Sequence, residues 1–262
     1  MHAVVLAAGY ATRLRPLTDQ VAKPLLPLAG RPMLDYLADK IDDVGEVERL
    51  HVVTNSRFAP AFDAWAEGRS GRLPVSVHDD GTRSNADRLG AIGDLRFVID
   101  QAGLEGRDLL VVAGDNLFDF SLADYVAFWR AREGSAIGVH DVGDLSLARQ
   151  YGVVDLDEDD LVVSLVEKPE EPASTFVSIA AYLFPAEHAA LVDEYLGEGN
   201  APDQPGRFVV WLYPRAPVYG YRFAGEWLDI GDRAQLLEAD NRMRRRAGLP
   251  EQDEYSSEPT HI

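Results

Sequence analysis

Short apolar runs alternate with longer stretches of helical periodicity in the first half of this 262-residue chain, and this alternation constrains the fold most. The pattern is typical of a largely parallel sheet whose faces are covered by helices. We expect strands and helices in turn over residues 3–7, 33–44, 50–54, 59–67, 75–77, 87–101 and 108–113, followed by a helix from Ser121. We therefore predict an α/β fold.

The order of strand-like and helical patterns changes after Ser135. Strand-like runs then follow one another with fewer long helices between them, at residues 136–140, 152–156, 161–166 and 178–184. Helical patterns return at residues 186–195 and 232–245. This order predicts a mixed, mostly parallel central sheet flanked by helices, in one domain over residues 1–248. The remainder, 249–262, is rich in Glu, Pro and Ser, and we expect a flexible tail there.

Composition excludes several classes of function. The chain has 25 Lys and Arg against 44 Asp and Glu, a formal net charge of −19, which argues against binding to nucleic acid or an anionic membrane. Cysteine is absent, so thiolate chemistry and disulfides are excluded. No apolar run reaches membrane-spanning length and no export-type leader is evident, so we expect a soluble cytoplasmic protein.

The densest chemical signal follows the first strand, in LAAGYATRLRPLTDQVAKPLLPLAGRP. A loop with Gly9 and Thr12 can bring backbone N–H groups close to phosphate, and Arg13 can add a forked contact. Arg15 and the proline-flanked Lys23 complete a local cationic cluster. Ligands bind α/β sheets at such strand ends, although a glycine turn with exposed basic residues is the simpler alternative. No P-loop or three-glycine dinucleotide fingerprint occurs.

Two isolated aspartates are candidate ligands for Mg²⁺. Asp115, in Gly-Asp-Asn, ends an apolar strand at the same edge as the Gly9 loop, although such a tripeptide is also common in turns. Asp229 lies between apolar neighbours, where a buried carboxylate needs a partner or a metal. Asp232 is better explained as the N-cap of the following helix.

A third pair, Glu167 and Lys168, ends a strand before a proline. Neighbouring side chains in a strand point to opposite faces, so one can reach a sugar hydroxyl and the other a phosphate. The alternative is a solvated strand end.

Together these segments resemble the sugar-1-phosphate nucleotidyltransferase family, especially its glucose-1-phosphate thymidylyltransferase-like members. The resemblance rests on LAAGYATRLRPLT with KPLLPLAGRPML, then AGDN, VEKP and WLDIG, in this order. It implies a Rossmann-like nucleotidyltransferase fold, in which residues 1–134 bind the nucleotide and 135–248 the sugar phosphate. It also implies the reaction of a nucleoside triphosphate with a sugar 1-phosphate, giving an NDP-sugar and pyrophosphate. The resemblance favours dTTP and glucose 1-phosphate as substrates, with Mg²⁺ as cofactor.

The same resemblance assigns roles to individual residues. As nucleotide-binding residues it implies Leu6, Ala8, Gly9, Thr12, Arg13, Lys23, Asn85, Leu89 and Gly90. It implies Arg13, Lys23 and Asp115 as catalytic residues, Asp115 and Asp229 as metal ligands, and Glu167, Lys168 and Val177 as sugar-phosphate-binding residues.

The sequence departs from the family pattern at three places, and these leave the base and the sugar open. Tyr10-Ala11 stands where a second glycine is frequent, and residues 81–95 lack a glutamine. Residues 177–182 read Val-Ser-Ile-Ala-Ala-Tyr, where many members carry a Thr-Gly or similar small pair before the aromatic. Alternatives are a cytidylyl- or guanylyltransferase for another sugar or polyol phosphate, a non-catalytic nucleotide-sugar-binding protein, and a glycosyltransferase. The oligomeric state is open, a homo-oligomer included.

Overall fold

Four parallel strands form one half of the central sheet in the computed structural model, which describes residues 1–257. They are β1 (His2–Leu6), β4 (Leu50–Thr54), β5 (Val75–Asp79) and β6 (Leu109–Ala113), with β1 between β4 and β6. β1, β4 and β6 are buried almost throughout, which explains why they read as continuous apolar runs.

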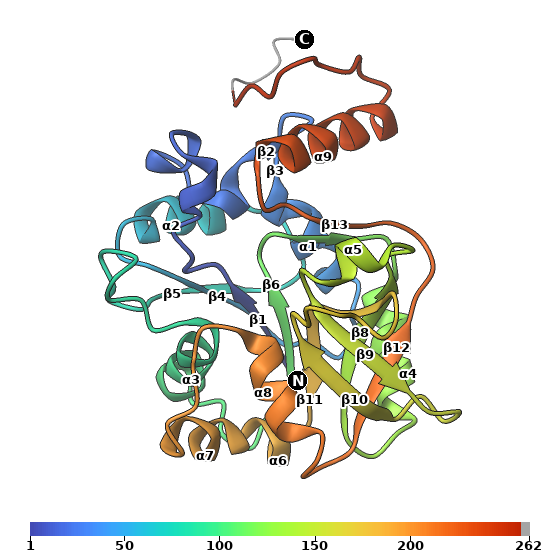
Figure 1. Cartoon of the computed structure of the whole chain (residues 1–262). Coiled ribbons are helices and arrows are strands. Elements are labelled where there is room, and N and C mark those ends of the chain that lie inside the picture. Colours follow the sequence, from blue (N-terminus) through green and yellow to red (C-terminus); the bar gives the residue numbers. More distant parts are fainter. Residues whose placement is uncertain (258–262) are drawn as a thin grey trace.

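Antiparallel strands extend this sheet beyond β6, so that in the described chain it has nine strands (Figure 1). β11 (Phe176–Phe184) pairs antiparallel with β6, with β8 (Ser135–Asp141) and with β9 (Gly152–Leu156). β10 (Val162–Glu167) forms one edge next to β9, and β12 (Val218–Arg222) runs parallel to β8. The predicted mixed sheet flanked by helices is confirmed. Its parallel pairs join β1, β4, β5 and β6 to one another and β8 to β12.

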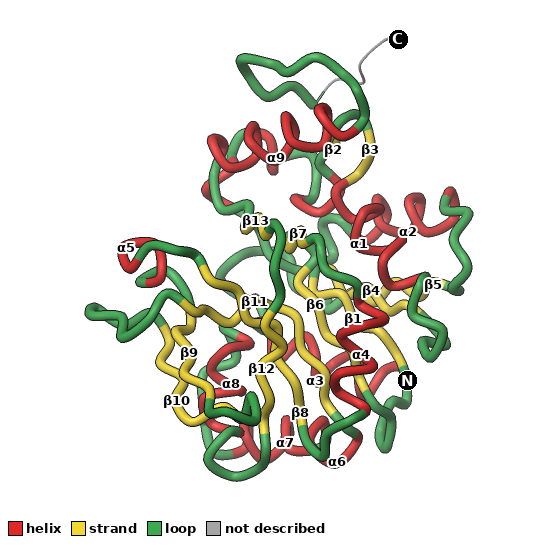
Figure 2. Tube along the Cα trace, turned by 90° about the vertical axis from the view of Figure 1, so that its right-hand side faces the viewer, coloured by secondary structure: helices red, strands yellow, loops and turns green. Residues whose placement is uncertain are grey.

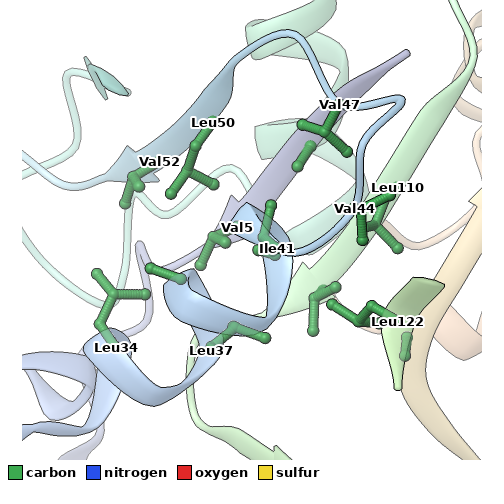
Figure 3. Packing of buried hydrophobic residues seen from close by; sticks show 14 of the residues in the cluster. Val5, Leu34, Leu37, Ile41, Val44, Val47, Leu50, Val52, Leu110 and Leu122 are labelled. Atoms are coloured by element: carbon green, nitrogen blue, oxygen red, sulfur yellow. The ribbon is translucent and has the colours of Figure 1, made fainter. Parts of the chain in front are cut away.

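Helices cover both faces of the sheet. On one face, α1 (Met33–Asp42), α2 (Ala59–Gly68) and α4 (Leu122–Arg130) pack on alternate residues of the strands, such as Val5 and Val52 (Figure 3). On the other, α3 (Ala91–Ala102), α7 (Leu191–Gly197) and α8 (Pro205–Leu212) pack on the intervening residues, such as Val4 and Val53. This alternation follows from the two-residue period of a strand.

A smaller layer lies beyond the carboxyl ends of the first strands (Figure 2). It contains α9 (Arg233–Arg246) and the hairpin of β2 (Pro27–Leu28) and β3 (Arg31–Pro32). Asp232 is the N-cap of α9, as predicted, because its carboxylate accepts from the N–H of Gln235 at 2.9 Å. In the part of the tail that the structure describes, the Tyr255 hydroxyl donates to the carbonyl of Pro27.

Several boundaries differ from the sequence prediction. The helix expected over residues 87–101 begins only at Ala91, because Gly90 has a φ of +81° and its backbone lies against Pro202. The helix expected over 186–195 is two helices, α6 (Ala186–Ala189) and α7. The sequence analysis missed α5 (Leu145–Ala148), α8, β12 and the short strands β2, β3, β7 (Asn116–Phe118) and β13 (Trp227–Asp229).

Two further expectations stay predictions. These are the single domain over 1–248 with its two halves and the flexible tail, whose last residues, 258–262, lie outside the described chain. None of the helices in residues 1–257 is long and apolar enough to cross a membrane.

Candidate active site

The first loop, residues 8–11, connects β1 to a short 3-10 helix over Thr12–Leu14. Asn55, at the end of β4, donates from Nδ2 to the carbonyl of Ala8 at 2.9 Å. Ala11 has a φ of +42°, in the left-handed region that glycine adopts with the least strain, so the backbone is locally strained at this alanine. The buried Tyr10 places its hydroxyl 3.2 Å from Oγ1 of Thr82. The loop is thus held from both sides, by β4 and by the segment after β5.

A cavity of about 190 Å³ lies beside this loop. Its lining residues are Leu6, Ala7, Gly9, Ala11, Arg13, Lys23, Pro24 and Asp115. Five of the predicted site residues therefore meet here, while Ala8 and Thr12 belong to the adjoining backbone without lining the cavity. The cationic cluster is smaller than expected, because Arg15 points away and pairs with Asp19 at 3.3 Å on the surface.

Lys23 forms an ion pair with Asp115. Its Nζ lies 2.5 Å from Oδ2 of Asp115, and the lysine side chain is only 11% exposed. Lys23 begins the 3-10 helix Lys23–Leu25, in which the ring of Pro24 restricts the backbone conformation. A charge-assisted contact of this kind fixes both side chains at the carboxyl ends of β1 and β6.

Asp229 lies close to Asp115, although the two are far apart in sequence. β13 pairs antiparallel with β7, and this register places Asp229 opposite Asn116, the residue after Asp115. Burial raises the pKa of Asp229, and the negative charge of Asp115 raises it further, while Lys23, a hydrogen bond from Tyr151 and Arg13 act in the opposite direction. Burial and the Asp229 charge also raise the pKa of Tyr151, to about 12, so its hydroxyl stays protonated and donates.

A second cavity, of about 260 Å³, opens on the other side of Asp115. Among its lining residues are Gln150, Tyr151, Glu167, Lys168, Ser178, Tyr182, Gln204, Gly206, Trp227 and Asp229. We call it the sugar cavity, after the sugar-phosphate-binding role that the sequence predicts for Glu167 and Lys168, and we call the smaller one the loop cavity. Asp115 lines both, so the two cavities meet at this carboxylate.

Glu167 and Lys168 both line the sugar cavity, which differs from the alternation expected of a strand. β10 ends at Glu167, and Lys168 has a φ of +50°, so the chain turns there and the pattern of opposite faces no longer applies. Two glycines make room for the carboxylate: a Cβ on Gly206 would stand 2.6 Å from Oε2 of Glu167, and one on Gly152 3.1 Å. Burial raises the pKa of Glu167, and the charges of Lys168 and Arg207 oppose that rise.

The structure does not bring Val177 to the cavity. Its side chain is fully buried with Ala148 and Val153, and the neighbouring Ser178 lines the cavity instead. The sequence analysis missed Gln150, Tyr151, Gln204 and Gly206. A polar-aromatic pair directly before a strand, and a Gln-Pro-Gly helix start, were the signals available for them.

Three of the predicted nucleotide-binding residues, Asn85, Leu89 and Gly90, lie between β5 and α3. Asn85 is exposed, Leu89 is half-buried, and Gly90 packs its backbone against Pro202. None of them lines the loop cavity or the sugar cavity. Their role in binding the nucleotide stays a prediction.

Asn116 and Trp227 connect the two aspartates to the sugar cavity. The indole Nε1 of Trp227 donates to Oδ1 of the buried Asn116 at 2.5 Å. The Trp227 ring also meets the ring of Tyr151 edge-on, at 4.9 Å between centroids. Asn116 therefore fixes the position of the Trp227 indole, which lines the sugar cavity next to Asp229.

The donor set fits Mg²⁺. Within residues 1–257 no group of three or more His, Asp or Glu side chains is arranged for a metal, so Asp115 and Asp229 would act as a pair. Mg²⁺ is commonly held by one or two carboxylates, with phosphate oxygens and water as the other ligands. Burial and then repulsion from Asp115 raise the pKa of Asp229, and a divalent cation bound between the two carboxylates offsets both effects.

Sequence comparisons match most of the chain to one family. A family model described as nucleotidyl transferase matches residues 2–246. The chain is 25% identical over 240 residues to the bifunctional protein GlmU of Methanocaldococcus jannaschii, covering 92% of this chain and 53% of that protein. It is 31% identical over 233 residues to mannose-1-phosphate guanylyltransferase of Mycobacterium tuberculosis, covering 88% of this chain and 61% of that protein. The chain thus spans between half and two thirds of the length of these relatives.

Among solved structures, one similar protein is from Bacillus anthracis, assigned as a glucose-1-phosphate thymidylyltransferase and crystallised with sucrose. The two folds agree with a TM-score of 0.79 at 20% sequence identity, over 98% of each chain. This likeness confirms the predicted Rossmann-like nucleotidyltransferase fold.

Proposed function

The chain belongs to the nucleotidyl transferase family, and on this premise we propose that it joins a sugar 1-phosphate to a nucleoside triphosphate, releasing pyrophosphate. The observation that carries the proposal is the position of Asp115, which lines both the loop cavity and the sugar cavity. The loop cavity offers Arg13, Lys23 and a glycine-containing backbone to phosphates. The sugar cavity offers Glu167, Ser178 and Lys168 to hydroxyls and a phosphate. The new bond would form where the two cavities meet.

The reaction needs cations and positioning more than proton transfer. An oxygen of the sugar phosphate attacks the α-phosphorus of the triphosphate, and the bond from that phosphorus to the leaving pyrophosphate breaks. No general base is required, because the attacking phosphate is already an anion at neutral pH. Two cavities that share a wall hold the reactants next to each other, and Lys23 and Arg13 offset the charge that develops on the α-phosphoryl oxygens.

Asp115 and Asp229 would hold Mg²⁺, which neutralises phosphate charge when bound. Tyr151 orients Asp229 through its hydroxyl, and Lys23 orients Asp115 through the ion pair. The protein's own residues thus fix both carboxylates before the substrates arrive.

The finer proposal is that dTTP and glucose 1-phosphate are the substrates, which the resemblance of the sequence motifs supports. Guanylyl transfer is the second candidate, because the Mycobacterium tuberculosis relative at 31% identity is named a mannose-1-phosphate guanylyltransferase. The cytoplasmic location stays a prediction from the sequence.

A matrix of dTTP, UTP, CTP, GTP and ATP against a panel of sugar 1-phosphates, read by pyrophosphate release with Mg²⁺, tests the proposal. We expect release only when both substrates are present, with the largest rate for dTTP and glucose 1-phosphate. Binding of an NDP-sugar without release in any combination would favour the non-catalytic sensor. Transfer of sugar from an NDP-sugar to an acceptor would instead favour a glycosyltransferase.

A further inference from the structure

Two buried carboxyl groups lie next to each other behind the first loop, and the proposed reaction uses neither. Asp80 follows β5 and is 9% exposed, and Asp94 stands in the first turn of α3 and is 6% exposed. Their side chains are hydrogen-bonded to each other. Oδ2 of Asp80 and Oδ1 of Asp94 are buried, and apart from the pair itself no donor of residues 1–257 reaches either oxygen. A hydrogen bond between two carboxyl groups requires that one of them is protonated.

The surroundings decide which group keeps the proton. Burial, and then the charge of Asp80, raise the pKa of Asp94 to about 8. Burial, and to a smaller extent the charge of Asp79, raise the pKa of Asp80 as well, but hydrogen bonds from Thr82 and Asp94 act against that rise and favour its ionised form. Two basic groups of the adjoining elements are engaged elsewhere: Arg88 pairs with Asp203 and Arg96 with Asp193.

This carboxyl pair connects three segments around the first loop. The ionised Asp80 accepts from the N–H of Thr82 at 2.7 Å, and Oγ1 of Thr82 meets the hydroxyl of Tyr10 at 3.2 Å. The backbone N–H of Asp94 donates to Gly90 at 2.7 Å, so Asp94 also belongs to the turn that begins α3. A chain of contacts therefore runs from α3 through Asp80 and Thr82 to Tyr10 in the first loop.

We propose that Asp94, in its protonated form, is a positioning residue that locks the first loop to the start of α3 and so sets the binding of the triphosphate. Loss of its proton places two like charges side by side in a buried site, where their repulsion separates α3 from the segment after β5. The first loop then loses its support through Thr82 and Tyr10. The inference rests on the proposed function in naming a triphosphate as the ligand.

The sign of the pH effect follows from the raised pKa. The support from protonated Asp94 is complete below the ordinary carboxyl pKa of 3.8 and is lost as the pH rises through about 8. If only the protonated form is competent to bind, the apparent KM for the triphosphate rises about tenfold between pH 7 and pH 9. If the carboxylate had to be ionised for binding, the apparent KM would instead fall as the pH rises.

The test compares wild type with Asp94→Asn, Asp94→Ala, Asp80→Asn and the control Asp100→Asn, an exposed acid on the same helix. Asparagine at position 94 can still donate to Asp80 but cannot ionise, so its KM for dTTP should stay constant from pH 7 to pH 9. Alanine should raise KM at every pH. With Asp80→Asn, the carboxyl at 94 can ionise without repulsion, so the alkaline rise should disappear. Asp100→Asn should behave as wild type.

A second readout needs no substrate. Hydrogen–deuterium exchange of residues 8–11 and 80–94, corrected for intrinsic exchange rates, should increase above pH 8 in wild type and stay flat in Asp94→Asn. An identical alkaline increase in wild type and Asp94→Asn would overturn the proposal, and so would no increase in wild type. If no triphosphate supports turnover, the proposed function fails, while the exchange experiment still decides the role of Asp94.

Discussion

The ammonium of Lys23 lies 2.5 Å from the carboxylate of Asp115, 92 residues later in the chain, at the point where the loop cavity meets the sugar cavity. This pair joins the segment after β1 to the segment after β6, two neighbouring parallel strands. Ligands commonly bind outside the carboxyl ends of such strands. The central electrostatic feature of the site is therefore produced by the order of the strands.

Replacing Lys23 by alanine should slow the transfer strongly. By analogy with the loss of one preorganised donor to a developing anion, we expect a cost of about 2–4 kcal/mol in kcat/KM. Lys40→Ala is the matched control, because Lys40 donates to the carbonyls of Asp119 and Phe120 away from both cavities. Pyrophosphate release at saturating Mg²⁺ measures both variants, and equal rates for the two would refute the role of Lys23.

Replacing either metal-ligand candidate by its amide should abolish pyrophosphate release with the fold intact. Asp115→Asn and Asp229→Asn keep the shape of the side chain but remove a carboxylate that Mg²⁺ prefers as a ligand. Asp63→Asn, an exposed position on α2, is the control. Circular dichroism checks folding, and titration of activity with Mg²⁺ checks the assignment. Unchanged Mg²⁺ dependence in both variants contradicts it.

Asn116→Ala should affect the sugar substrate more than the nucleotide. The variant removes the acceptor of the Trp227 indole, so the ring that walls the sugar cavity is no longer fixed. We expect KM for the sugar 1-phosphate to rise about five- to tenfold, which is the loss of one hydrogen bond of about 1 kcal/mol or more. KM for the triphosphate should change less than twofold. A uniform rise in both would mean that Asn116 supports the site only generally.

Acid should destabilise the fold through a row of three histidines. His2 Nδ1 lies 3.0 Å from His51 Nε2, and His51 Nδ1 lies 2.9 Å from His78 Nε2, across β1, β4 and β5. Burial, followed by the nearby His78 and His2, lowers the pKa of His51 to about 3. Neutral His51 therefore adds stability that is present above its ordinary pKa of 6.5 and is lost as the pH falls toward 3.

The measurement is urea unfolding between pH 7 and pH 4 in wild type and His51→Gln. Each proton taken up only by the unfolded chain lowers the free energy of unfolding by about 1.4 kcal/mol per pH unit. The slope with pH should therefore be shallower in His51→Gln. Equal slopes would show that another group carries the acid sensitivity.

Core packing on the α1 face should dominate the response to truncation. Leu34 is fully buried against the central strands, so Leu34→Ala should cost about 2–5 kcal/mol of unfolding free energy (Figure 3). Leu145 is 51% exposed, and Leu145→Ala should change the stability little. Urea midpoints compare the two. A smaller loss for Leu34 than for Leu145 would contradict the assignment of the core.

The sequence predicted most reliably those elements whose own residues carry the signal. Strand β4 was predicted with its observed ends, because Leu50–Thr54 is buried on both faces and bounded by polar residues. The strands β7 and β13 were missed, since three residues carry no periodicity and their pairing joins segments far apart in the sequence, with Trp227 opposite Phe118 and Asp229 opposite Asn116. Local pattern contains no information about such a contact.

The same distinction separates the site residues that the sequence predicted from those that it did not. Gly9, Arg13, Lys23 and Asp115 were predicted because they follow strands that end at one edge of the sheet, and the structure brings them to one cavity. Tyr151 was missed, since only the fold brings it to Asp229. The turn at Lys168 was missed too, because a positive φ at lysine is set by the surrounding chain and not by the residue itself.

The central claim is that the chain transfers a nucleotidyl group, and the fate of the phosphates tests it most directly. The enzyme is incubated with Mg²⁺, a sugar 1-phosphate and a triphosphate labelled either at the α- or at the γ-phosphate, and the products are separated. The account predicts that the α-label appears in an NDP-sugar and the γ-label in pyrophosphate, in equal amounts, and that both are lost in Asp115→Asn. Release of the γ-label as inorganic phosphate, or an NDP-sugar without the α-label, would contradict it.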